Sequence, residues 1–213
     1  MFMENKDALG YWTKVAQNNP NELIAKVNPC NDFTQMDADF IMRYADENSE
    51  ILDLASSTGL TINKYYQKVK HIEAVELYKE FTKFIQKTDK ISIVNCDIKD
   101  YTTDKKFDIV NMFGITCYFS DDEVTKLYKK YQSYLRPNGK LIVKSQFGVN
   151  EDVIVSGFSQ ELKTDYFCCY RHLPKEVEIL KSVGYKDVQT FDIYPPEGNR
   201  WSNTHFYAIV ASL

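Results

Sequence analysis

Small residues and an acidic side chain surround the turn that ends the first apolar segment, at residues 50–60. The segment reads EILDLASSTGL, so Asp53 is followed by Ala55, Ser56 and Ser57 and then by Gly59. Small side chains let a ligand approach the backbone closely, and glycine can adopt the strained conformation of a turn that leads into a helix. This turn is therefore a candidate ligand-binding loop.

The next two apolar segments each end beside an acidic residue. Glu76 follows HIEAV at 71–75, and Asp97 follows the segment ISIVN at 91–95. A carboxylate at the end of a strand can accept both hydroxyl hydrogens of a ribose, as an acidic residue does in nucleotide-binding folds. Glu76 is thus a candidate for binding a ribose.

The first turn does not match two common nucleotide-binding motifs. A dinucleotide-binding fold has G-x-G-x-x-G here, so that a pyrophosphate rests on the following helix N-terminus. This turn has one glycine, Gly59, and the P-loop pattern does not occur in the chain. The sequence therefore disfavours NAD and FAD as cofactors.

Alternating strand-like and helix-like segments position these residues. Short apolar runs predict strands at 50–54, 71–75, 91–95, 107–112, 140–145, 188–193 and 206–211. Apolar residues at helical spacing predict helices at about 5–18, 36–46, 60–66, 78–87, 121–135 and 175–183. Strands separated by helices pair in parallel, whereas the last two strands are joined without a helix and can be antiparallel. We therefore expect a doubly wound α/β fold, with a Rossmann-like, mostly parallel seven-stranded sheet and an antiparallel strand at its C-terminal end.

Composition narrows the class of protein. The 213 residues include 26 Lys+Arg and 30 Asp+Glu, and this net charge of −4 argues against a general nucleic-acid binder. No apolar run reaches the length of about 18–20 residues that a membrane span needs, and the N-terminus lacks the pattern of a secretory signal. Five cysteines without a pattern favour free thiols in a reducing compartment and no structural zinc. We expect a cytoplasmic protein without a metal site.

Segments between residues 50 and 145 resemble, in order, the motifs of the class I S-adenosylmethionine-dependent methyltransferases. The family's first motif is an acidic residue followed by G-x-G-x-G; Asp53 and Gly59 match it, while Ala55 and Ser57 stand in place of the first two glycines. The segments NCDI at 95–98, FDIVNMFG at 107–114 and LRPNGKL at 135–141 are similar to later motifs of the family. The family's base-methylating motif N/D-P-P-Y/F does not follow the fourth strand, so a nucleic-acid acceptor is not expected.

The resemblance implies a cofactor and a set of residues that bind it. The cofactor is S-adenosylmethionine, with Glu76 on the ribose, Asp97 on the adenine amino group and Ile98 against the ring. The full expected set is Tyr11, Asp53, Ala55, Ser56, Ser57, Gly59, Glu76, Leu77, Cys96, Asp97, Ile98, Asn111, Met112 and Phe113. The chain is then one methyltransferase domain, with a helical cap (1–46), a cofactor-binding core (47–145), a substrate-lid insertion (146–175) and a C-terminal helix and strands (176–213).

The acceptor site is expected outside these motifs. Its candidates are aromatic and arginine residues from the first helix, the end of the fourth strand, the insertion after the fifth strand and the connection between the last two strands: Trp12, Tyr118, Tyr170, Arg171 and Arg200. His172 and His205 are candidate general bases, because imidazole titrates near neutral pH. The alternative for the aromatic residues is core packing or a surface position, and for the two arginines it is ion pairing at the surface.

The expected reaction is methyl transfer to an O or N atom of a small molecule. A resemblance of the region 170–201 to bacterial methyltransferases of surface-polysaccharide biosynthesis points to a sugar or an anionic sugar-linked metabolite. Two alternatives stay open: a protein or peptide acceptor, and a non-catalytic cofactor-binding module, which the missing glycines at Ala55 and Ser57 suggest.

Overall fold

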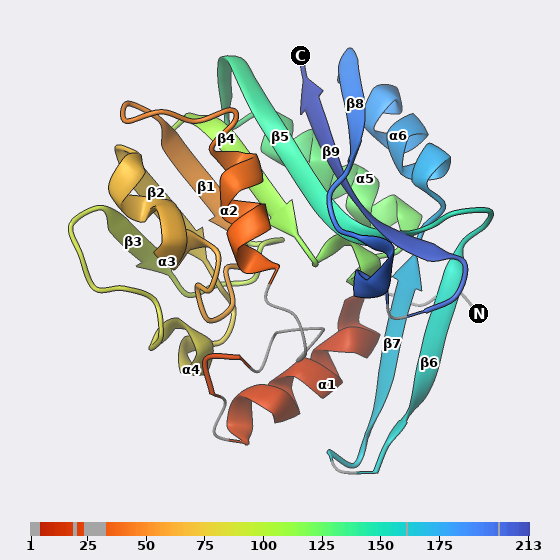
Figure 1. The fold of residues 1–213 in the computed structure, drawn as a ribbon. Coiled ribbons are helices and arrows are strands. Elements are labelled where there is room, and N and C mark those ends of the chain that lie inside the picture. The colour runs from red at the N-terminus through yellow and green to blue at the C-terminus, as the bar shows by residue number, and fades with distance from the viewer. Residues whose placement is uncertain (1–4, 19–20, 24–32, 161, 200) are drawn as a thin grey trace.

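A seven-stranded sheet forms the centre of the computed structural model, which describes residues 5–18, 21–23, 33–160, 162–199 and 201–213 (Figure 1). Its strand order is β3-β2-β1-β4-β5-β9-β8. The strands are β1 (Glu50–Leu54), β2 (His71–Val75), β3 (Ile91–Val94), β4 (Phe107–Phe113), β5 (Leu135–Gly148), β8 (Asp187–Asp192) and β9 (Thr204–Ser212). Strands β1 to β5 pair in parallel, and β9 is antiparallel to both β5 and β8. The predicted doubly wound fold is confirmed.

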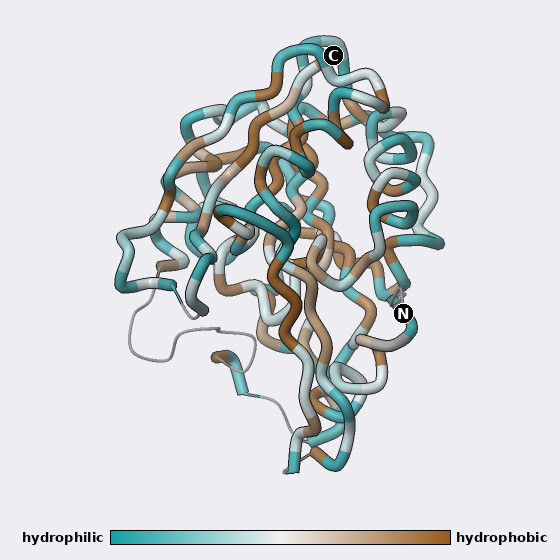
Figure 2. Tube along the Cα trace, turned by 90° about the vertical axis from the view of Figure 1, so that its right-hand side faces the viewer, coloured by the Kyte–Doolittle hydropathy of each residue, from teal (hydrophilic) through white to brown (hydrophobic). Residues whose placement is uncertain are grey.

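Helices cover both faces of the sheet. The helices of the structure are α1 (Asn5–Gln17), α2 (Thr34–Ile41), α3 (Ile62–Tyr65), α4 (Lys79–Thr82), α5 (Asp121–Gln132) and α6 (Leu173–Ser182). Helices α2 and α3 lie on one face and α5 and α6 on the other, whereas α1 packs against α4 and the segment Thr164–Tyr170. Successive residues of a strand point to opposite faces, so Ile51 packs with α2 and α3 whereas Leu52 and Leu54 pack with α5 and α6. The central strands β1, β2 and β4 are buried on both faces and are mostly apolar, whereas the edge strand β8 is largely exposed (Figure 2).

Several elements end at other residues than the sequence predicts. Helix α2 ends at Ile41 and α4 at Thr82, where i to i+3 hydrogen bonds of Phe84 and Ile85 continue the chain as tight turns. Strand β5 begins at Leu135 and takes in the predicted turn 136–139, with a register shift opposite Phe107 and Ile109. Helix α5 begins with the capping box of Ser120 and Glu123, which satisfies backbone N–H groups at its first turn.

The segment after β5 contains a hairpin that the sequence patterns did not predict. Strands β6 (Val153–Ser159) and β7 (Thr164–Tyr170) form an antiparallel two-stranded sheet beside α1 (Figure 1). The ring of Tyr166 in β7 lies 4.9 Å from that of Tyr11 in α1. The expected insertion therefore packs on the N-terminal helix.

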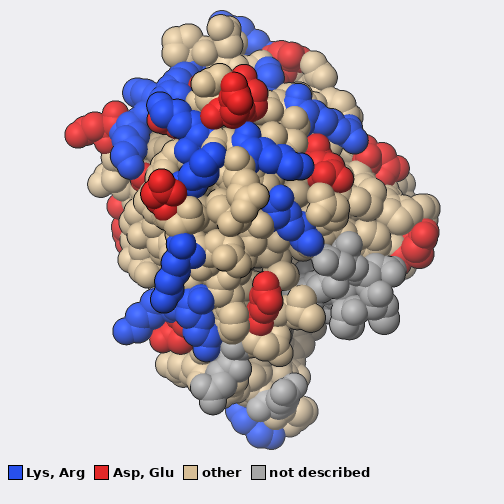
Figure 3. Space-filling model, turned by 60° about the vertical axis from the view of Figure 1, so that its left-hand side comes forward, with Lys and Arg blue, Asp and Glu red and all other residues tan. Residues whose placement is uncertain are grey.

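The surface carries charges of both signs. Figure 3 shows Lys and Arg side chains interspersed with Asp and Glu on the face that it presents. Among the described residues, no helix combines the length and the apolar character that a membrane crossing requires. The described cysteines, Cys96, Cys117, Cys168 and Cys169, are free thiols, and Cys30 lies outside the described residues.

Candidate functional site

A cavity of about 290 Å³ opens at the carboxyl ends of the central strands. Its wall combines the turn after β1, the residues after β2, β3 and β4, a side chain of β5, and parts of α1 and α2. Most residues of the expected cofactor set line it: Asp53, Ala55, Ser56, Ser57, Glu76, Leu77, Cys96, Asp97, Ile98 and Phe113. In an open α/β sheet this edge is the usual place for a ligand.

The turn after β1 keeps the backbone conformation that glycines ordinarily provide. Ala55, Ser57 and Gly59 all have positive φ angles, of 59°, 51° and 75°. For a residue other than glycine, this left-handed conformation costs on the order of 1–3 kcal/mol. Gly59 does not line the cavity, and a Cβ atom there would lie 2.7 Å from Cγ1 of Ile85. Only the first two positions therefore tolerate a side chain.

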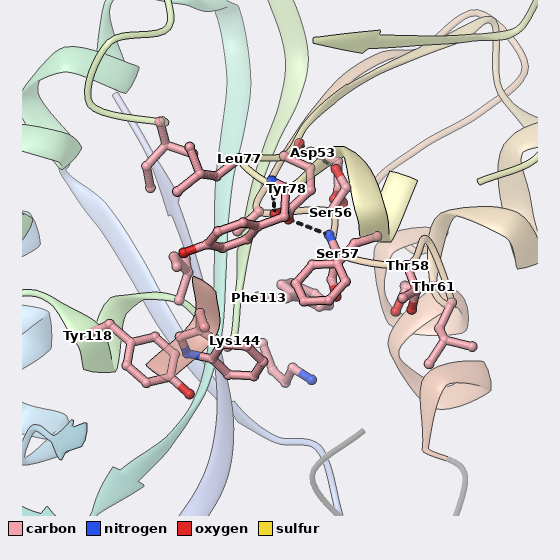
Figure 4. Close-up of a pocket in the computed structure, with 18 of the residues that line it drawn as sticks. Asp53, Ser56, Ser57, Thr58, Thr61, Leu77, Tyr78, Phe113, Tyr118 and Lys144 are labelled. Carbon is pink, nitrogen blue, oxygen red and sulfur yellow. Dashed lines mark hydrogen bonds between the residues drawn. The ribbon is translucent and has the colours of Figure 1, made fainter. Parts of the chain in front are cut away.

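Glu76 joins this turn to the end of β2. Its Oε2 accepts a hydrogen bond from the backbone N–H of Ser57 at 2.8 Å, and its Oε1 accepts one from Tyr78 at 2.9 Å (Figure 4). Burial raises the pKa of Glu76, against the opposing effect of these N–H groups. A carboxylate has about four acceptor positions, so Glu76 can also accept two hydroxyl groups of a ligand in the cavity.

Asp53 is buried at the end of β1, where Asn111 of β4 donates to its Oδ2 at 3.3 Å. Burial raises the pKa of Asp53 to about 6, and hydrogen bonds from Ser56 and Asn111 act in the opposite direction. The carboxylate therefore lowers the stability of the folded chain near neutral pH. A cationic ligand group beside it would offset this cost.

We expect Asp53→Asn to stabilise the ligand-free protein above pH 6. The folded-state pKa of about 6 lies above the unfolded value of about 3.9, so the folded state binds more protons between these values and its stability falls as pH rises through that window. The substitution removes this penalty, about 1–3 kcal/mol at pH 8. Urea unfolding at pH 4.5 and pH 8 measures it: the advantage of the variant grows with pH, and an advantage equal at both pH values contradicts the assignment.

Aromatic and aliphatic side chains form the wall after β2 and β3. Leu77, Tyr78 and Phe81 follow β2, and Cys96 and Ile98 follow β3. Asp97 lies among them, and its Oδ1 accepts the backbone N–H of Lys99 at 2.8 Å. An apolar slot with one carboxylate suits a flat heterocycle that carries an amino group.

Two buried polar atoms at the cavity have no hydrogen-bond partner among the described residues, Oγ of Ser57 and Oδ1 of Asn5. Buried polar groups are nearly always paired in folded proteins. These two atoms therefore fit a polar ligand that supplies the missing partners.

Helix α1 forms one side of the cavity and is held in place at its first residue. The backbone N–H of Asn5 donates to Glu123 at 3.0 Å, and its side-chain amide donates to the carbonyl of Tyr118 at 3.2 Å. Trp12 and Tyr118 both line the cavity, with ring centres 5.8 Å apart. Tyr11 does not line it, because its ring packs against Trp12 and the hairpin.

Asn111 and Met112, two further residues of the expected cofactor set, lie in β4 and do not line the cavity. Both are fully buried in the sheet, Met112 in the core between β4 and α5 and Asn111 between Asp53 and the hydroxyl of Tyr65. Asn111 therefore acts on the site through Asp53.

Arg171, which was expected to bind the acceptor, does not line the cavity and is buried away from it. Its side chain is 2% exposed and forms an ion pair with Glu176, which is 0% exposed. The guanidinium also donates to the carbonyl oxygens of Phe119 at 2.7 Å and Thr116 at 2.6 Å. Each of its three guanidinium nitrogens therefore binds within the protein, at the junction of β7, the segment 116–119 before α5, and α6. Tyr170 beside it packs on the two buried cysteines Cys117 and Cys168.

The two candidate bases also lie outside the cavity. A ring nitrogen of His172 lies 3.1 Å from the carbonyl oxygen of Val149, and His205 bonds through both ring nitrogens, to Asn199 and Asp192. Arg200 lies outside the described residues. The structure thus brings Trp12 and Tyr118 together at the cavity, but not Tyr170, Arg171, His172 or His205.

The cavity contains a polar cluster that the motifs did not indicate: Asp37 of α2, Lys144 of β5 and Tyr194. A signal for Lys144 is present in the sequence, since it is a charged residue near the carboxyl end of the otherwise apolar strand LIVKS at 141–145. A charge inside a strand buried on both faces is uncommon unless it is paired. No comparable signal marks Asp37 within its helix.

Comparisons with known proteins agree with this geometry. Residues 51–139 match a family model described as a methyltransferase domain. The DhpI–SAH complex has a TM-score of 0.76 at 18% identity, covering 98% of this chain and 96% of that chain. An S-adenosylmethionine-dependent methyltransferase from Clostridium acetobutylicum ATCC 824 has a TM-score of 0.69 at 17% identity, covering 95% of this chain and 99% of that one.

A third similar structure is the Burkholderia thailandensis 1,6-didemethyltoxoflavin-N1-methyltransferase with bound 1,6-didemethyltoxoflavin and S-adenosylhomocysteine. Its TM-score is 0.74 at 13% identity, covering 95% of this chain and 86% of that one. No curated protein matches the sequence. At such identities the likeness establishes the fold, and the domain match over the cofactor-binding motifs adds the activity class. By this match residues 51–139 are a methyltransferase domain, in a chain that has the fold of S-adenosylmethionine-dependent methyltransferases.

Proposed function

We propose that this protein methylates an O or N atom of a small molecule bound in the cavity beside the turn after β1. S-adenosylmethionine supplies an electrophilic methyl group when it is bound. The observation that carries the proposal is Glu76, a buried carboxylate that borders the cavity and keeps acceptor capacity beyond its two backbone partners. Glu76 would hold the ribose, and Asp97 and Ile98 the adenine.

The methionine part would lie against the turn at 53–59. Asp53 offers a carboxylate to an ammonium group, and Oγ of Ser57, which has no partner in the described part of the chain, offers a further hydrogen bond. Trp12 and Tyr118 present aromatic faces, which attract a sulfonium by about 0.5–2 kcal/mol. These positions support a catalytic site in preference to a module in which the missing glycines abolish cofactor binding.

A small acceptor is favoured over a protein or peptide. Helix α1 lies along the cavity and is anchored through Asn5, so the space beside the turn is bounded on that side. The Burkholderia thailandensis structure contains a bound small acceptor in a similar fold. The sugar or sugar-linked acceptor suggested by the sequence belongs to this class of small molecules.

We expect Glu76→Gln to weaken binding of S-adenosylhomocysteine by ten- to a hundredfold, about 1.4–2.7 kcal/mol. The amide keeps the size of the side chain but loses the charge that strengthens the ribose hydrogen bonds. Calorimetry with the purified protein measures the change.

Glu73→Gln is the matched control, because Glu73 is also buried in β2 but accepts from Tyr101 and Lys105 and does not line the cavity. We expect the Glu73→Gln protein to bind S-adenosylhomocysteine with the affinity of the wild type. Equal affinities of Glu76→Gln and the wild type would overturn the ribose assignment.

A further inference from the structure

Lys144, Asp37 and Tyr194 hydrogen-bond to one another in a triangle at the part of the cavity formed by α2 and β5. Nζ of Lys144 donates to Oδ2 of Asp37 at 2.9 Å and to the hydroxyl of Tyr194 at 2.9 Å. The Tyr194 hydroxyl in turn donates to Oδ1 of Asp37 at 2.7 Å. An ammonium has three donors, so Lys144 keeps one for which no described residue is the acceptor.

The surroundings of Lys144 keep it a cation. Its Nζ lies 5.0 Å from the ring centres of Phe113 and Tyr194 and 5.9 Å from that of Phe206. Burial lowers the pKa of Lys144, but the charge of Asp37 and the hydrogen bonds outweigh it, so the net shift is upward. Lys144 is therefore a fixed positive charge and cannot act as a general base near neutral pH.

The order of the strands places this charge on the acceptor side of the proposed cofactor site. Asp97, Glu76 and the turn at 53–59 follow β3, β2 and β1, which are neighbours in that order. A nucleoside bound along this row leaves the methyl group towards β4 and β5. Lys144 lies directly opposite Phe113, the last residue of β4, and adjacent strands are about 4.8 Å apart.

The residues that line the cavity also indicate which kind of acceptor atom can attack the methyl group. No histidine is among the described residues of the cavity wall, since His172 and His205 lie elsewhere. A hydroxyl or ammonium nucleophile needs a base, whereas a carboxylate or phosphate oxygen does not. We infer that Lys144, positioned by Asp37 and Tyr194, binds an oxyanion of the methyl acceptor, so that the acceptor is a small carboxylate or phosphate-type acid.

This inference rests on the proposed function and specifies its chemistry. The acceptor oxygen forms the new bond to the methyl carbon, the bond from that carbon to sulfur breaks, and its electron pair stays on sulfur. The product is a neutral methyl ester of the carboxylate, or a phosphate-type ester with one charge fewer. No proton is released, and Lys144 keeps its own throughout.

The test is calorimetric titration of the protein saturated with S-adenosylhomocysteine, at fixed ionic strength, with benzoate, phenyl phosphate and neutral benzamide. The aromatic probes suit the rings of Phe113 and Phe206. We expect at least one anion to bind ten times more tightly than benzamide. Lys144→Met should weaken that anion at least tenfold and leave benzamide unchanged. Tighter benzoate indicates a carboxylate acceptor, and tighter phenyl phosphate indicates a phosphate-type acceptor.

Asp37→Asn combined with Lys144→Met keeps the triangle uncharged, and it replaces the single variant if the unpaired Asp37 prevents folding. The inference is overturned if the wild type binds the anions and benzamide with equal affinity. It is also overturned if Lys144→Met, or the double variant, binds the anions as tightly as the wild type does. Weaker binding of S-adenosylhomocysteine but not of 5′-methylthioadenosine by the variant also overturns it, because Lys144 would then hold the cofactor's own carboxylate. Failure of the wild type to bind S-adenosylhomocysteine refutes the proposed function itself.

Discussion

Arg171→Met should lower the free energy of unfolding by about 3–5 kcal/mol, the cost of breaking a buried ion pair by removing one partner. The substitution leaves the carboxylate of Glu176 buried with Tyr128 as its remaining partner. It also removes the donors to the carbonyl oxygens of Phe119 and Thr116. Urea unfolding measures the loss.

Lys175→Met is the control for this prediction. Lys175 pairs with Asp121 and Asp152 at the surface, where its side chain is 38% exposed, so the loss should stay below about 1 kcal/mol. The double variant Arg171→Met, Glu176→Gln should recover part of the stability, because no unpaired charge remains buried. If the Arg171→Met protein were as stable as the wild type but unable to methylate an acceptor, the structural role would be wrong and Arg171 would belong to the acceptor site.

Ala55→Leu should weaken binding of S-adenosylhomocysteine more than a hundredfold, or more than about 2.7 kcal/mol. Ala55 lines the cavity and has a φ of 59°, so a longer side chain both occupies the ligand space and strains the turn. Calorimetry gives the affinity, and circular dichroism shows whether the variant is folded.

Ala55→Gly is the matched variant at the same position. It relieves the left-handed strain and leaves the cavity open, so it should bind S-adenosylhomocysteine at least as tightly as the wild type. If Ala55→Leu bound as well as Ala55→Gly, the turn after β1 would not contact the cofactor.

The strand pattern and the cofactor motifs were predictable from the sequence because they depend on local order. The apolar runs of β1 and β2 begin and end at the predicted residues. Glu76 and Asp97 follow β2 and β3, which lie side by side because consecutive parallel strands joined by a right-handed crossover are usually neighbours. The side chains at these strand ends consequently reach one cavity.

The acceptor side depends on contacts between segments far apart in the chain, which the sequence patterns do not encode. Arg171 and His205 have the residue types of an active site, but their partners Glu176 and Asp192 fix them elsewhere. Lys144 lines the cavity and pairs there with Asp37, a residue of α2 whose position no local pattern predicts. The hairpin β6–β7 was missed because much of β6 is exposed, so it lacks a buried apolar period.

Calorimetric titration of the wild-type protein with S-adenosylhomocysteine tests the central claim most directly. The account predicts saturable binding at one site per chain, with competition by S-adenosylmethionine. It also predicts loss of that binding in Ala55→Leu but not in Ala55→Gly. Absence of binding for both compounds by a folded protein would contradict the assignment of the cavity beside Glu76 as the methyl-donor site.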